Sequence, residues 1–135
     1  MKKAVAVVCL VISFLLMFCG CRMIRIEDEE RKPVDYSVLN QQEIPKEVQN
    51  LIEEKKEREF QISFQIGEEL YLIRGYGRQM SGGYSIRVEE LSESSNGLFF
   101  QTRLLGPPDD SLEGEPSYPC IVVRLEYREK PVIFE

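Results

Sequence analysis

The chain has 135 residues, with 17 basic and 23 acidic side chains, no histidine and a net charge of −6. The length allows one domain with a leader or tether, and the acidic balance argues against nucleic acid, whose phosphates require clustered Lys and Arg. The lack of histidine excludes Ser-His and Cys-His nucleophile pairs and removes the commonest general base and metal ligand. We therefore expect no catalytic residue, no cofactor, no metal and no small-molecule substrate.

Residues 1–20 have the pattern of a secretory signal peptide. Lys2 and Lys3 precede an apolar run from Ala4 to Phe18, and small residues follow the run. The run spans 15 residues, whereas a membrane-spanning helix needs about 20, so an uncleaved anchor is the weaker alternative.

The Gly20-Cys21 pair at the end of this run resembles a bacterial lipobox. Phe18 and Cys19 depart from the Leu and the Ala or Ser that are usual there. The resemblance predicts a lipoprotein, cleaved before Cys21 and carrying a diacylglycerol thioether with fatty acyl chains such as palmitate on that cysteine. We expect the acyl chains to hold the mature protein on the cell membrane of a bacterium, outside the cytoplasm, because a net acidic chain has no polybasic attraction for lipid.

The four cysteines leave no pair for an internal disulfide. Cys9 and Cys19 lie in the leader, and Cys21 is the expected lipidation site. Cys120 is then the one remaining thiol, in the apolar segment 118–123. We interpret it as a buried, inert thiol rather than a reactive one.

Residues 21–44 are expected to form a charged, flexible tether. The run Glu27–Pro33 is rich in charge and poor in apolar residues, and residues 40–42 are polar. Such a segment buries too little surface to offset its ordering entropy. A spacer between membrane and domain is the main interpretation, and an acidic contact for a partner is the alternative.

The domain is expected over residues 45–135, beginning with a helix at 45–58. Pro45 suits a helix start, and Val48, Leu51 and Ile52 repeat on one helical face. From residue 60 the apolar period changes to two, which is typical of half-buried strands. We predict strands at residues 60–66, 69–76, 84–89, 98–105 and 119–128, with a short edge strand at 132–134.

The hairpin signal is strongest at Asn96-Gly97, because this pair accepts positive φ at low cost. Short strands with turns between them predict a mainly β fold. We expect a small antiparallel β-sandwich or open barrel of five to six strands, with one N-terminal helix packed on it.

The sharpest local pattern follows the second strand. Residues 71–76 are followed by a polar loop and then by Ser81-Gly82-Gly83-Tyr84-Ser85, where the next strand opens. This pattern resembles the PrcB C-terminal domain family, whose hallmark is Thr-Gly-Gly-Tyr-Ser, with Ser81 in place of Thr. Pro107-Pro108 and Tyr118-Pro119 match further family positions, and the resemblance covers about residues 45–134. It implies an accessory lipoprotein of a cell-surface protease complex.

The loop of Ser81, Gly82, Gly83 and Tyr84 is the predicted partner-binding loop. Loops on a rigid sheet commonly carry recognition, and the glycine pair permits close backbone approach. The structural alternative is a tight turn with Tyr84 packed as a lid. The loop also resembles the Thr-Thr-Gly-Tyr loop of chagasin-type inhibitors, which leaves a protease inhibitor as an alternative function. A structural envelope lipoprotein without a dedicated partner is another.

Two sets of polar residues are better explained as ordinary surface residues than as binding sites. Arg74, Tyr76 and Arg78 share one strand face, and a polar sheet face accounts for them without an acidic partner. The acidic residues of the last long loop have no calcium-loop spacing, so we expect them to be solvated; they are Asp109, Asp110, Glu113 and Glu115. The chain is therefore expected to be a non-enzymatic, lipid-anchored module that binds a protein, with a protease as the favoured partner.

Overall fold

The computed structural model describes residues 2–5, 30–108 and 114–135. The predicted lipidation site Cys21 and most of the predicted signal peptide lie outside these residues. So do Asp109, Asp110 and Glu113 of the acidic loop. Among the described residues no helix is long and apolar enough to cross a membrane.

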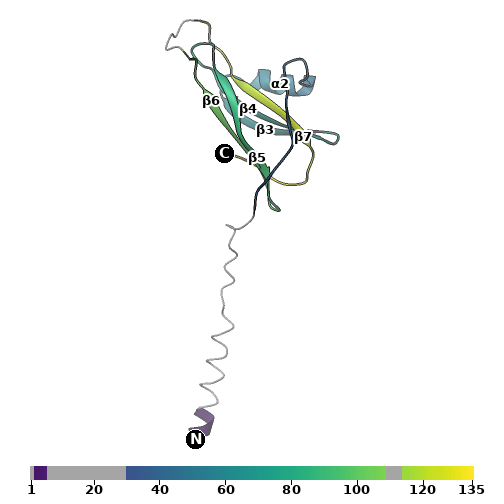
Figure 1. The fold of residues 1–135 in the computed structure, drawn as a ribbon, viewed down its shortest axis with the longest axis vertical. Coiled ribbons are helices and arrows are strands. Elements are labelled where there is room, and N and C mark those ends of the chain that lie inside the picture. The colour runs from purple at the N-terminus through teal and green to yellow at the C-terminus, as the bar shows by residue number, and fades with distance from the viewer. Residues whose placement is uncertain (1, 6–29, 109–113) are drawn as a thin grey trace.

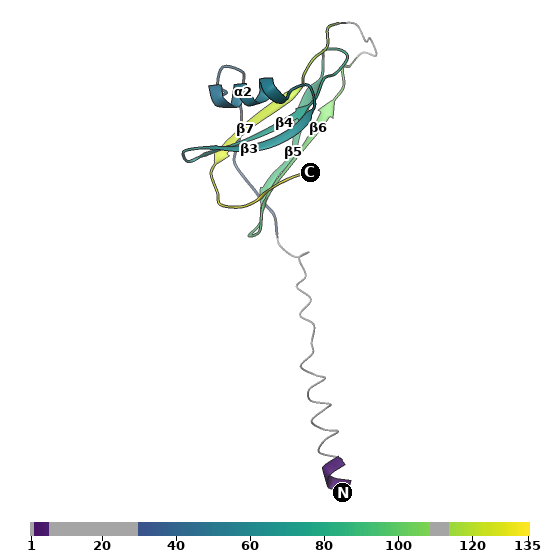
Figure 2. The same ribbon diagram turned by 180° about the vertical axis from the view of Figure 1, so that it is seen from behind.

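The described residues from 30 onward form a β-sandwich of two four-stranded sheets with one helix on an outer face (Figures 1 and 2), and residues 2–5 are helical. One sheet has the order β1-β5-β6-β8, and the other has the order β2-β7-β4-β3. The strands are β1 (Lys32–Pro33), β2 (Ser37–Val38), β3 (Glu59–Ile66), β4 (Glu69–Tyr76), β5 (Ser85–Glu93), β6 (Leu98–Leu105), β7 (Cys120–Glu126) and β8 (Val132–Phe134). The predicted sandwich and its mainly β class are confirmed.

Two details differ from the expected fold. The described residues contain eight strands rather than five or six, because β1 and β2 precede the helix. The pairs are antiparallel except for β6 and β8, which run parallel. The parallel pair arises because the chain leaves β7 in one sheet and crosses to the other, where Leu98 N–H donates to Pro131 O at 2.9 Å.

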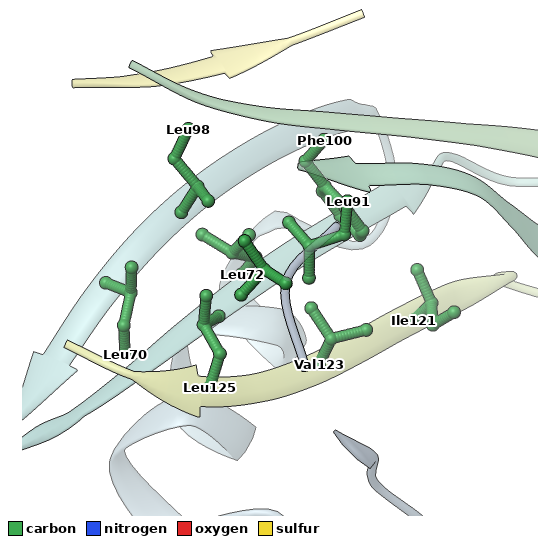
Figure 3. Close-up of a cluster of buried hydrophobic side chains, with 9 residues drawn as sticks. Leu70, Leu72, Leu91, Leu98, Phe100, Ile121, Val123 and Leu125 are labelled. Carbon is green, nitrogen blue, oxygen red and sulfur yellow. The ribbon is translucent and has the colours of Figure 1, made fainter. Parts of the chain in front are cut away.

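The main core fills the space between the two sheets. Leu72, Leu98 and Val123 have no exposed surface, and Phe100 has 1%. Strand alternation places these side chains on the inner faces, where they pack with Val34, Leu70, Leu91, Ile121 and Leu125 (Figure 3). The rings of Phe100 and Phe134 pack edge to face, with centroids 6.0 Å apart, and this contact joins β8 to the core.

A second core lies on the outer face of the β2-β7-β4-β3 sheet, under helix α2 (Lys46–Lys55). Val48 of α2 is fully buried there against Tyr71 and Ile73 of β4. β4 is divided between the two cores: Leu70 and Leu72 face one core, and Tyr71 and Ile73 face the other. Because this sheet is covered on both faces, β4 is held in place. The loop that contains Gly82 and Gly83 therefore starts from a fixed position.

The tether predicted for residues 21–44 is wrong for the part that the structure describes. Val34 and Leu39 are each 7% exposed and belong to the two cores. Val34 N–H donates to Leu91 O at 3.0 Å and Leu39 N–H donates to Val122 O at 2.9 Å, one bond to each sheet. Residues 30–44 are thus part of the domain, because two isolated apolar side chains and these strand bonds offset the polar composition around them.

The predicted hairpin between β5 and β6 is present, but its turn differs from the expected one. Ser94 N–H donates to Gly97 O at 2.9 Å, and Asn96 N–H donates to Ser94 Oγ at 3.2 Å. Neither Asn96 nor Gly97 has positive φ. The serine hydroxyl therefore supports this turn, whereas the positive φ expected of an Asn-Gly pair is not used.

Candidate functional site

The loop of residues 77–84 joins β4 in one sheet to β5 in the other, at one end of the sandwich (Figure 1). It lies beside the loop after β6, because Gln79 and Ser117 form an antiparallel bridge. Gln79 N–H donates to Ser117 O at 2.8 Å, and Ser117 N–H donates to Gln79 O at 3.0 Å. The loop is therefore held by strand-like bonds rather than by its own turn alone.

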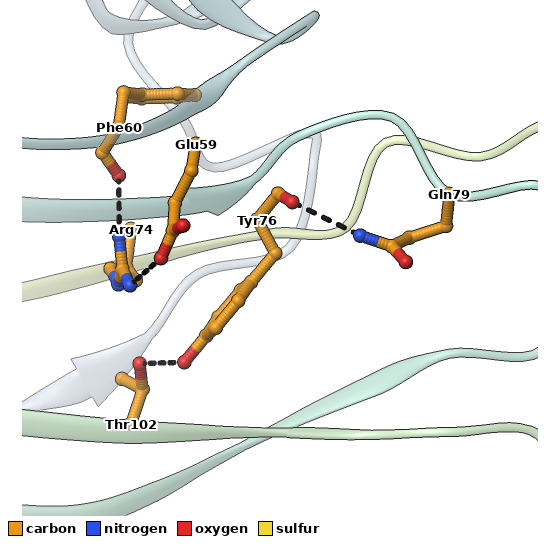
Figure 4. A network of polar contacts seen from close by, with 6 residues as sticks. All are labelled: Glu59, Phe60, Arg74, Tyr76, Gln79 and Thr102. Carbon is orange, nitrogen blue, oxygen red and sulfur yellow. Dashed lines mark hydrogen bonds and ion pairs between the residues drawn. The ribbon is translucent and has the colours of Figure 1, made fainter.

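A polar network supports the start of this loop (Figure 4). The hydroxyls of Tyr76 and Thr102 share a hydrogen bond that joins β4 to β6 across the sandwich. Gln79 Nε2 donates to Tyr76 O at 3.0 Å, and the Arg74 guanidinium lies 4.6 Å from the centre of the Tyr76 ring. These contacts restrict the end of β4, so the loop departs from a fixed position.

Two of the three residues on the expected polar face, Arg74 and Tyr76, take part in this network. Arg78 does not. The Arg74 side chain is 15% exposed, pairs with Glu59, and donates to Phe60 O at 3.3 Å. Arg78 is exposed and uses its backbone N–H to reach Glu57 O at 3.3 Å. Arg74 is thus occupied inside the molecule.

Ser81 has its side chain turned into the protein. It is 1% exposed, and its carbonyl accepts a 2.6 Å hydrogen bond from Ser117 Oγ. Its own hydroxyl makes only a long contact with Gly82 O at 3.3 Å. Of the four predicted loop residues, Ser81 therefore anchors the loop, whereas Gly82 and Gly83 are exposed and Tyr84 is half-buried.

The two glycines of the motif differ in what surrounds them. Gly83 has φ +86, and a Cβ there would lie 2.9 Å from Pro107 Cβ. A Cβ on Gly82 would meet nothing within 4 Å. Gly83 is hence favoured by the backbone conformation and by the lack of room for a side chain beside Pro107, while Gly82 leaves open backbone at the surface.

Met80 is the functional candidate that sequence reasoning missed. It is 72% exposed, the largest value among the exposed large hydrophobic residues of the folded domain that the structure describes. It precedes buried Ser81 and follows bonded Gln79, so an apolar side chain is presented to solvent from a restrained backbone. The sequence could have indicated Met80, because it is an apolar residue inside a polar loop and does not belong to the apolar pattern of either neighbouring strand.

Tyr84 lies half-buried at the end of the same loop. It lines a hollow of about 260 Å³ together with Leu39, Pro119 and Ile121. Val38, which is 55% exposed, lies at the same hollow. We call Met80, Gly82, Gly83, Tyr84 and Val38 the loop-end surface. Its members are uncharged, with exposed Arg78 two residues before Met80, and such a surface fits a contact with another protein better than a chemical reaction.

The chemistry available near this surface is limited. Burial raises the pKa of the Cys120 thiol to about 12, so the sulfur stays protonated and weakly nucleophilic at neutral pH. In the described part of the chain no three Asp, Glu, Cys or His side chains are grouped to hold a metal ion. The half-buried Cys120 serves instead as an apolar member of the core beneath α2.

The model of the family described as PrcB C-terminal matches residues 70–126. The match begins in β4, ends with β7, and includes both loops that form the bonded end of the sandwich. The comparison with curated proteins and the comparison with solved structures gave no match.

Proposed function

We propose that this chain, whose residues 70–126 belong to the PrcB C-terminal family, is a non-enzymatic accessory module that binds another protein outside the cytoplasm. Its anchor is a lipidated Cys21, and its partner is a cell-surface or secreted protease. The observation that carries the binding role is Met80, an exposed side chain on a loop tied down on both sides.

The energetics of the loop-end surface support a binding role. Association of two proteins costs free energy for every loop that must be ordered, and a preformed loop avoids that cost. The Gln79–Ser117 bridge and the Ser117–Ser81 bond order this loop before any partner arrives. An exposed, unbranched Met adapts its shape to an apolar pocket, as Met does at many binding surfaces.

The binding role is tested by capture from solubilised membranes. The full chain with a C-terminal affinity tag is expressed in the bacterium that naturally produces it. Wild type and the Met80→Gln variant are compared. We expect the wild type to retain a partner protease, and Met80→Gln to retain at least tenfold less of it because its apolar contact is lost. Equal capture by both proteins would contradict the assignment of the loop-end surface.

Ile133→Gln is the matched control. Ile133 is also an exposed apolar residue, at 41%, but it lies in β8 beside residue 99 at the start of β6. The loop-end surface lies beyond the other end of β6. Capture should therefore be unchanged by this substitution.

The anchor is tested separately from the binding role. Intact-mass analysis should find a mature chain that starts at Cys21 and carries diacylglycerol and acyl groups. Cys21→Ala should block processing and release the domain from the membrane. A leader that is still attached, or processing that is unaffected by Cys21→Ala, would contradict the anchor and leave the binding test unaffected.

A further inference from the structure

β3 is a long, uncovered edge of its sheet. It lies beside β4 on one side and, among the described residues, has no strand on the other. β3 has eight residues, whereas the edge strands β1, β2 and β8 have two or three. Proteins usually protect such edges with short strands, Lys, Pro or a covering element. The β3 sequence EFQISFQI contains one charge and no Lys or Pro.

The outward-facing backbone groups of β3 follow from the register. Tyr76 N–H donates to Pro119 O at 3.0 Å, toward β7, so the adjacent Gly75 directs its groups toward β3 and its partner Phe60. Alternation then directs the N–H and C=O of every second residue away from β4; these residues are Glu59, Gln61, Ser63 and Gln65. Within the described chain, their backbone groups form no hydrogen bond to another element.

The side chains of β3 are divided in the same alternating way. The apolar residues lie half-buried on the face covered by α2; they are Phe60, Ile62, Phe64 and Ile66. On the opposite face, Gln61, Ser63 and Gln65 are exposed and uncharged. A strand added to this edge would therefore match it with an apolar row on one face and a neutral polar row on the other.

We propose that two copies of this chain associate by antiparallel pairing of β3 with β3 about a two-fold axis at Ser63. In that register Ser63 faces Ser63 of the second copy, and Gln61 faces Gln65. Both pairs use backbone groups that point outward, so the hydrogen bonds of the two edges complete each other. Ile62 then lies opposite Phe64, and the two apolar rows become one. The contact is isologous, as expected for a closed dimer.

Charge at the ends of β3 favours a second copy over an unrelated strand. Arg58 precedes β3 and Glu68 follows it, and both are exposed. The two-fold pairing brings Arg58 of one copy opposite Glu68 of the other at both ends. Glu59, the one charge within the strand, faces Gly67 and not another carboxylate. The strand is thus complementary to itself in hydrogen bonding, apolar pattern and terminal charge.

The test is a charge exchange at the two-fold axis. Two copies of the full chain with different affinity tags are expressed together, and co-purification of one with the other is measured. Wild-type copies should co-purify. Ser63→Lys in both copies, or Ser63→Glu in both, should reduce co-purification at least tenfold because like charges meet at the axis. Ser63→Lys in one copy and Ser63→Glu in the other should restore it.

The restored pair also controls for folding, since misfolded variants would not recover. Ser85 is the matched control, because it is an exposed serine at the start of β5 in the other sheet. The same exchanges at Ser85 should leave co-purification unchanged. Failure of wild-type copies to co-purify, failure of the mixed pair to recover, or capture of a different protein in place of the second copy would overturn the proposal.

Discussion

Gly83 shows at the residue scale why the Gly-Gly loop needs its second glycine. Its φ of +86 is costly for any residue with a Cβ, and Pro107 occupies the space that a Cβ would fill. We expect Gly83→Ala to lower the free energy of unfolding by about 1–2 kcal/mol. Gly82→Ala should change it by less than about 0.5 kcal/mol, because its surroundings are open. Urea unfolding measures both; equal losses would contradict this division of roles.

The raised pKa of the Cys120 thiol predicts how the free energy of unfolding changes at alkaline pH. Burial raises its pKa from an ordinary 9.0 to about 12 in the folded chain. As pH rises from about 9 toward 12 the unfolded chain loses this proton first, so the free energy of unfolding falls over that window. Urea unfolding at pH 8 and pH 10.5 should show a smaller fall for Cys120→Ala than for wild type. An identical fall in both proteins would show that the thiol is not shielded.

The orientation of loop residues was beyond prediction from sequence. Ser81 is buried because Ser117, 36 residues later, donates to its carbonyl, and Gly83 is constrained by Pro107. Both are contacts between loops, and no local pattern encodes them. The position of the loop itself was predictable, since the apolar segment of β4 ends before it and a glycine-rich segment follows.

At the scale of elements, residues 30–44 form a strap that adds one short strand to each sheet. Leu39 of this strap is 7% exposed, while its neighbour Val38 is 55% exposed. We expect Leu39→Ala to cost roughly 2–5 kcal/mol, since it removes buried methyl groups and leaves a cavity. Val38→Ala should cost less than about 0.5 kcal/mol.

Thermal or urea unfolding of the two variants tests whether the strap belongs to the domain. A flexible tether would give two neutral substitutions, which would contradict the structure described here.

The strands that sequence predicted well show one of two patterns. β3 lies between a core and solvent, so its apolar and polar side chains alternate, whereas β4 lies between two cores and is apolar on both faces from Leu70 to Ile73. β1 and β2 have two residues each, too few for any period to appear. β8 was placed correctly as a short edge strand, but its parallel pairing with β6 depends on a crossing between sheets, which alternation does not encode.

At the scale of the whole molecule, the two proposed contact surfaces lie on different parts of the sandwich. The loop-end surface lies past Leu105, where β6 ends, and carries the proposed protease contact. The β3 edge lies along the side of the other sheet and carries the proposed self-association. Because the two surfaces involve different residues, a dimer of this chain presents two copies of the loop-end surface, and bivalent binding raises the apparent affinity for a clustered partner.

Met80 is proposed to touch another protein in the native envelope. A photoreactive amino acid placed at position 80 tests this directly, because irradiation of intact cells links it only to groups in contact. We expect a discrete protease adduct from position 80 and none from position 133 under identical irradiation. The absence of an adduct at position 80, or the same adduct from both positions, would contradict it.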